Sequence, residues 1–139
     1  MSARESILAA IAALVSSTTG FTTYRSRQAA VARIEGTVAI VEPDEEAAIT
    51  LGTGATMRQL IVSIVFIGRD QIPDQVLDQP IADMHAKMMA ELTLGNLAAK
   101  IVEHSTRWNI EVADLAAAAV NVRYVVHYLT PAKSLASTI

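Results

Sequence analysis

Three histidines are the side chains of this 139-residue chain best suited to moving a proton or binding a metal ion: His85, His104 and His127. No two of them lie four residues apart on an expected helix, so the sequence predicts no helical zinc site. His85 and nearby Asp83 point in different directions, because residues two apart on a helix do not face each other. His127 alternates with apolar residues on an expected strand, which is typical of a surface or interface residue.

Other catalytic patterns are lacking as well. The chain has no Gly-x-Ser-x-Gly sequence and no cysteine, which removes a nucleophile elbow, cysteine nucleophiles, thiolate metal ligands and disulfides. Gly52-Thr53-Gly54 lacks the Gly-Lys-Ser/Thr that completes a phosphate loop, and a flexible turn explains it. From its residue chemistry we predict a protein that is not an enzyme and uses no cofactor or metal.

Two small groups stand out among the charged residues. An acidic group follows an expected strand and contains Glu42, Asp44, Glu45 and Glu46. We interpret it as a solvated face rather than a divalent-ion site, which needs spaced oxygen ligands. A basic group contains Arg25, Arg27 and Arg33. It lacks the interleaved aromatic side chains of a single-strand nucleic-acid binder, and the net charge of −3 also argues against tight nucleic-acid binding.

Composition predicts one domain over residues 1–139, with apolar surface in excess of what its own fold buries. Hydrophobic residues make up 52% of the chain, and only 18% of residues are charged, below the ~25% usual for globular domains. No apolar run approaches the ~20 residues needed to cross a bilayer, so we expect no membrane association. The single tryptophan, Trp108, is either a contact for a partner or a core residue at a strand edge.

The N-terminal half predicts one helix, a short extended segment over residues 21–25 and two strands. Ser2 and Glu5 form a capping box for a helix over about residues 3–15, although the same apolar run imitates a secretory leader. A strand over residues 37–42 should end at Pro43, and residues 43–56 should form a loop that is functional or mobile. The run from Met57 to Arg69 gives the strongest strand signal, apolar on both faces. We expect it to be covered on both sides by helix or partner, and it is long enough to project partly as a hairpin arm.

The C-terminal half predicts one helix and three extended segments. The helix spans about residues 74–92, with Pro80 expected to split or kink it. The segments cover residues 97–103, 106–112 and 120–129, and residues 114–119 are either a helical turn or a loop. This order predicts an α+β fold, a largely antiparallel mixed sheet packed with two main helices in one small domain.

Several short motifs, taken in order, resemble one family. They are Tyr24-Arg25-Ser26-Arg27, the segment from Val38 to Val41 followed by Pro43, the long strand from Met57, Pro73-Asp74 with His85 downstream, Thr93-Leu94-Gly95, and the closing run from Arg123 to Thr130. This layout resembles the tail-terminator proteins of long-tailed bacteriophages, the minor tail protein U type. The alanine-rich stretch from Asp114 to Ala119 departs from the glycine turn expected there.

The resemblance implies a virion structural protein that catalyses nothing. It implies a small subunit, made and assembled in the host cytoplasm, that forms a hexameric ring at the head-proximal end of the tail tube. The ring stops tube polymerisation and provides the docking surface for the head connector. Its partners would be other copies of itself, the tail tube protein and the head–tail connector protein, with DNA only passing through the lumen.

Residues for these roles follow from charge and position. Glu42, Asp44, Glu45 and Glu46 are candidate lumen acids, since carboxylates repel phosphates and let DNA slide. The candidate interface residues are Arg25, Arg27, Val65, Ile67, Trp108 and His127. Two alternatives stay open: a head-completion or other head–tail joining protein, and a small enzyme or ligand-binding domain that uses His85 or His127.

Overall fold

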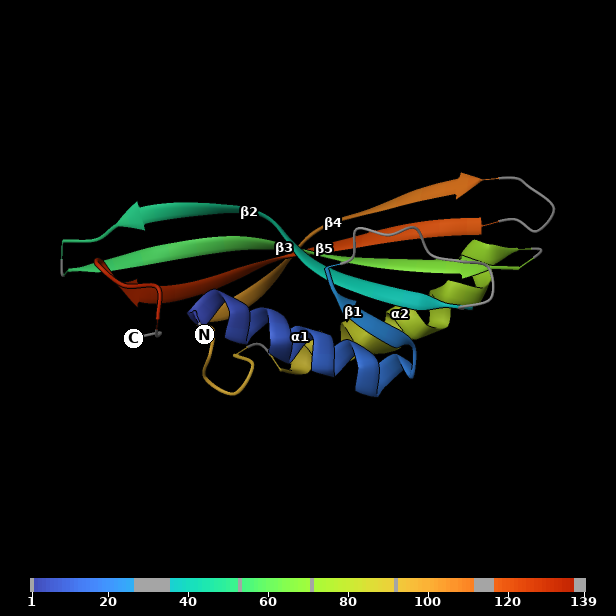
Figure 1. Cartoon of the computed structure of the whole chain (residues 1–139), viewed down its shortest axis with the longest axis horizontal. Helices are drawn as coiled ribbons and strands as arrows, with labels where there is room; N and C mark the ends of the chain where they lie inside the picture. The colour runs from blue at the N-terminus through green and yellow to red at the C-terminus, as the bar shows by residue number, and fades with distance from the viewer. Residues whose placement is uncertain are drawn as a thin grey trace.

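The computed structural model describes residues 2–26, 36–52, 54–70, 72–91, 93–111 and 117–136. Within these ranges two helices lie on one face of a five-stranded sheet (Figure 1). The elements are α1 (Ala3–Thr19), β1 (Thr22–Arg25), β2 (Val38–Thr50), β3 (Ala55–Arg69), α2 (Pro73–Ala90), β4 (Lys100–Glu111) and β5 (Ala117–Pro131). The predicted α+β class is confirmed.

The strands lie in the order β1-β2-β3-β5-β4. Only β1 and β2 are parallel, and every other neighbouring pair is antiparallel, which confirms the largely antiparallel mixed sheet. The outermost strands are β4 on one side and the four-residue β1 on the other. Because β1 pairs with only Val38–Val41, β2 also has an uncovered edge beyond Val41 among the described residues.

Helix α1 begins where the capping box predicts, since the side chain of Ser2 accepts a hydrogen bond from the backbone N–H of Glu5 at 3.1 Å. It continues four residues past the expected end. The hydroxyls of Ser17 and Thr19 donate to the carbonyls of Leu14 and Val15, so these turn formers are satisfied inside the helix. The expected apolar stripe is buried: Ile7, Leu8, Ile11, Leu14 and Val15.

Helix α2 runs unbroken through Pro80, so of the two predicted effects, a split or a kink, the split is wrong. Pro80 removes one backbone donor, but buried anchors hold the helix on the sheet on either side of it, Leu77 before and Met84 after. The side chain of Leu77 packs against Gly68 of β3. A Cβ added to Gly68 would lie 3.1 Å from the Cδ2 atom of Leu77. A glycine at this position therefore allows α2 to approach the sheet closely.

The predicted loop over residues 43–56 is wrong, because β2 continues through Pro43 to Thr50 and pairs with β3 along its whole length. A β-bulge lies between Pro43 and Glu45, at a place where no described strand pairs with the outer edge of β2. Proline is tolerated at such positions, since no ladder donor is required there. The end of the β2–β3 hairpin extends past the start of α1, which agrees with the expected hairpin arm (Figure 1).

Strand β3 confirms the alternation read from its sequence on the helix side, where Leu60, Val62, Ile64 and Phe66 are buried. Both helices cover this face only. On the face of the sheet turned away from the helices, which we call the far face, Ile61, Val65 and Ile67 are half-buried. Cover of the far face by a partner stays a prediction.

The two expected segments over residues 97–103 and 106–112 merge into one strand, β4, with a bulge at His104. Strand β5 begins at Ala117, so the last three residues of the alanine-rich stretch are extended rather than a helical turn or loop. Its predicted alternation is confirmed: Val122, Tyr124, Val126 and Tyr128 are buried against the helices. Arg27, Arg33, Thr53, Leu92 and Asp114 lie outside the described residues.

Candidate functional site

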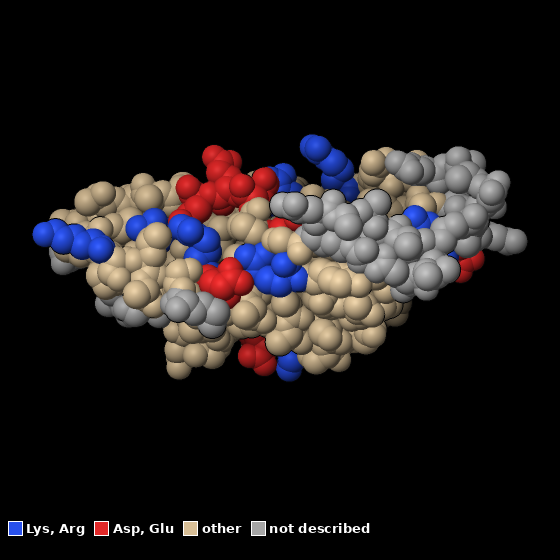
Figure 2. Space-filling model, viewed as in Figure 1, with Lys and Arg blue, Asp and Glu red and all other residues tan. Residues whose placement is uncertain are grey.

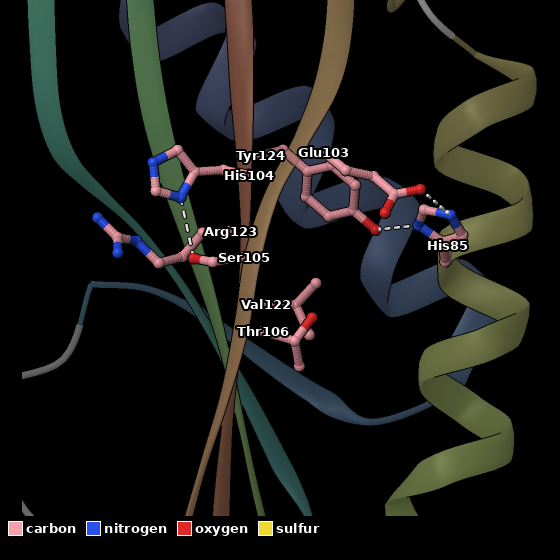
Figure 3. Close-up of a pocket in the computed structure, with 8 residues that line it drawn as sticks. All are labelled: His85, Glu103, His104, Ser105, Thr106, Val122, Arg123 and Tyr124. Atoms are coloured by element: carbon pink, nitrogen blue, oxygen red, sulfur yellow. Dashed lines mark hydrogen bonds and ion pairs between the residues drawn. The ribbon is translucent and has the colours of Figure 1, made fainter.

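His85 links α2 to two strands of the sheet (Figure 3). Its Nδ1 atom lies 2.7 Å from the hydroxyl of Tyr124 in β5, and its Nε2 atom lies 2.9 Å from a carboxylate oxygen of Glu103 in β4. The rings of His85 and Tyr124 are stacked at 5.8 Å. Neither of these partners of His85 is indicated by the sequence.

A polar pocket of about 130 Å³ opens beside this histidine. It is lined by His85, Glu103, His104, Ser105, Thr106, Val122, Arg123 and Tyr124 (Figure 3). Both ring nitrogens of His85 thus have side-chain partners in the sheet. Burial, with the charge of Glu103 adding to it, raises the pKa of Tyr124, so its hydroxyl stays protonated and available to donate. The arrangement ties α2 to β4 and β5.

In the part of the chain that the structure describes, no three histidine or acidic side chains converge. His104 lies at the bulge of β4 with its Nδ1 atom 2.9 Å from the Ser105 hydroxyl. His127 lies on the far face, and its pKa is lowered by burial and by the charge of Lys100. His85 and His104 therefore line the same pocket, whereas His127 lies on the far face.

Glu46 is not a lumen acid, because its side chain is only 12% exposed and lies on the helix side of the sheet. The bulge between Pro43 and Glu45 explains this placement. One extra residue reverses the alternation, so Glu46 faces the helices, whereas an unbroken strand would place it on the far face.

Glu46 is bound by side chains from three elements. Arg4 of α1 binds both carboxylate oxygens, Arg58 of β3 reaches one of them at 3.5 Å, and the hydroxyl of Tyr128 donates to the other. Burial opposes ionisation, but hydrogen bonds from Arg4 and Tyr128 outweigh it and lower the pKa of Glu46. Burial and Glu46 raise the pKa of Tyr128 to about 12. The cluster fixes the N-terminus of α1 to the β2–β3 hairpin.

The other three predicted acids stay together at the surface of β2. Asp44 and Glu45 are exposed and Glu42 is half-buried. Asp44 is paired with Arg123 of β5. Figure 2 shows acidic side chains gathered over β2 at the upper edge of the view. These three remain candidates for an acidic surface.

The predicted interface residues are spread over both faces. Arg25 binds Glu5 of α1 with two hydrogen bonds of 2.8 and 3.0 Å, so it holds β1 on the helix. Val65, Ile67 and His127 lie on the far face. Trp108 lies on the helix side of β4 and is 59% exposed, so the alternative of a core tryptophan is wrong.

The outer side of β4 is the most exposed apolar part of the described sheet. Trp108 and Ile110 lie on its helix side and Val102 on the far face, each more than two-fifths exposed. Between β4 and α2 runs a groove of about 250 Å³, lined by residues that include Ile81, Ala82 and Thr106. We call the outer edge of β4 together with Trp108 and Ile110 the β4 surface.

Comparison with known proteins leaves the family open. No protein-family model and no curated protein matches this chain. The resemblance to tail terminators therefore stays a prediction. Among the described residues, neither helix is long and apolar enough to cross a membrane.

Sequence reasoning missed the contacts of Glu46 and of His85. The only sequence signal for the contacts of Glu46 is Pro43 inside a β-rich stretch, which permits a bulge as well as a strand end. No local sequence pattern indicates the contacts of His85, because His85 and Tyr124 are 39 residues apart.

Proposed function

We propose that this protein is a structural subunit of a long-tailed phage that acts by self-association, as a ring at the head-proximal end of the tail tube. There it ends tube polymerisation and provides the surface on which the head connector docks. The observation that carries the proposal is the β4 surface, a long strand edge without a partner in the described structure, beside exposed Trp108 and Ile110. Unpaired strand edges are ready-made surfaces for pairing with another chain.

Exposed large apolar side chains on an edge strand are unusual in a protein that works alone, since natural edges are normally short or charged. Aromatic residues are enriched at the centres of protein interfaces. An assembly role agrees with both points and with the low share of charged residues.

The polar pocket supports a structural role more than an enzymatic one. In this structure both ring nitrogens of His85 contact side chains of the sheet, Tyr124 and Glu103. These contacts join α2 to β5 and β4, which is what a structural histidine does.

Glu42, Asp44 and Glu45 fit a surface that repels DNA, as a ring lumen requires. With the net charge of −3, they favour passage of DNA without binding. In this proposal the protein resides in the virion after assembly in the host cytoplasm.

A tube-polymerisation assay tests this function. We expect the protein to bind one end of growing tail tubes and shorten them, as seen by negative-stain microscopy. Trp108→Ala should lose this effect, whereas Leu135→Ala, which removes an exposed apolar side chain elsewhere, should retain it. Tubes of unchanged length with no bound protein contradict the proposal, and binding away from the head-proximal end favours another head–tail joining role.

A further inference from the structure

Besides the short outer edge of β1, two long strand edges lack a neighbouring strand within the described residues. One is the outer edge of β4, from Lys100 to Glu111. The other is the stretch of β2 from Glu42 to Thr50, because β1 ends beside Val41. Each exposes backbone donors and acceptors that a further strand can satisfy.

We propose that the two edges pair with each other between copies: the outer edge of β4 in one subunit receives the Glu42–Thr50 stretch of β2 from the next. The inference rests on the proposed function only in that the chain self-associates. It adds which strand edges of the two subunits meet and in which relative direction the strands run.

The strand directions favour this pairing. β2, β3, β5 and β4 alternate in direction across the sheet, so β2 and β4 run opposite ways. A second copy placed beside β4 in the same orientation therefore brings its β2 alongside as an antiparallel strand. The contact joins two different surfaces, and repeated contacts of this kind close into a ring when the rotation permits.

The charges on the far face favour it as well. The free stretch of β2 places Glu42 and Glu45 on that face, opposite Ser63 and Ile61 of β3. β4 places Lys100 and Arg107 on the same face, opposite His127 and Asn121 of β5. Pairing β4 with β2 can set Arg107 against Glu42, whereas β2 against β2 brings carboxylates together.

The length of the free stretch sets the register. Glu42 is the first residue of β2 that β1 does not cover, so β4 of the adjacent copy can extend along β2 only as far as Glu42 before it meets β1. The register with Arg107 opposite Glu42 reaches this limit and pairs opposite charges. The rest of the free stretch then lies along β4 towards Lys100, over nearly equal lengths. Trp108 follows immediately, where the neighbour's β1 ends.

The absence of natural cysteines allows a direct cross-linking test. Glu42→Cys and Arg107→Cys subunits are mixed, allowed to assemble with tail-tube subunits, and oxidised. We expect a covalent dimer in the mixture, at least tenfold above either variant alone. Lys133→Cys replaces Arg107→Cys in the control mixture, since Lys133 is an exposed cation outside β4.

The outcomes separate the two proposals. Rings with cross-linking no higher than the Lys133→Cys control overturn the strand pairing and leave the ring intact. Efficient cross-linking of Arg107→Cys alone also overturns it, in favour of two β4 edges meeting. Failure of the cysteine-free protein to assemble under any condition overturns both. As a second measurement, Arg107→Glu should abolish assembly and Glu42→Arg in the same chain should restore it.

Discussion

Arg4 in α1 binds both carboxylate oxygens of Glu46 in β2, across 42 residues of sequence. Around this pair Tyr128 and Arg58 complete the contacts of the carboxylate. The ion pair lies where the hairpin leaves the cover of the helices, so it connects the core to the projecting part of β2 and β3.

We predict that Glu46→Gln lowers the free energy of unfolding by about 1.5–3 kcal/mol, because Arg4 and Arg58 lose a charged partner that is largely buried. Urea denaturation followed by circular dichroism measures the loss. The matched control is Glu45→Gln, exposed and one residue earlier, which should change stability by less than about 0.5 kcal/mol. Equal effects of the two variants contradict this role of Glu46.

The contribution of Glu46 should depend on pH. Its pKa in the folded protein is below the unfolded value of 4.5, so the folded state favours the ionised form. The resulting stability is complete above the unfolded pKa and is lost as pH falls through the folded pKa. The difference in unfolding free energy between the natural protein and Glu46→Gln should therefore be large at pH 7 and shrink below pH 4.5. A difference that grows on acidification contradicts the assignment.

The two faces of β3 should respond differently to a charge. Val62 is fully buried under the helices, so Val62→Asp should cost at least about 3 kcal/mol and leave little folded protein. Val65 lies on the far face and is half-buried, so Val65→Asp should fold with a smaller loss. Thermal unfolding distinguishes the two. If Val65→Asp folds but does not assemble, the far face belongs to the subunit interface.

Much of the fold could be predicted from local patterns. The alternation of Leu60, Val62, Ile64 and Phe66 is set by burial of one sheet face, and the start of α1 is set by the Ser2 cap. Pro43 misled the prediction, because proline ends a central strand but is tolerated at a bulge beside an uncovered edge. Whether an edge is uncovered depends on the order of strands in the sheet, which local sequence does not contain.

The candidate surfaces were less accessible to sequence reasoning. The bulge turns Glu46 to the helix side, so its chemistry differs from that of Glu45 although the two residues are adjacent and identical. His85 gains its partners because α2 crosses β5 and β4, a geometry set by packing of the whole domain. For Trp108 the sequence left a partner contact and a core position open; its 59% exposure excludes the core, and the partner contact stays a prediction.

Trp108 also provides a spectroscopic signal, since it is the only tryptophan in the chain. We expect its fluorescence to shift to shorter wavelength when subunits assemble, as the indole leaves water. Trp108→Phe assembled in parallel gives the background from tyrosine and from the tube protein. Emission that stays at the solvent-exposed wavelength in an assembled ring contradicts a role for Trp108 in the contact.

Native mass spectrometry, with and without tail-tube subunits, tests self-association most directly. We expect one closed multimer of defined subunit number, formed by the protein alone or on the tube. We expect Arg107→Glu to abolish this multimer. A protein that stays monomeric in both conditions, at concentrations where tubes form, contradicts it.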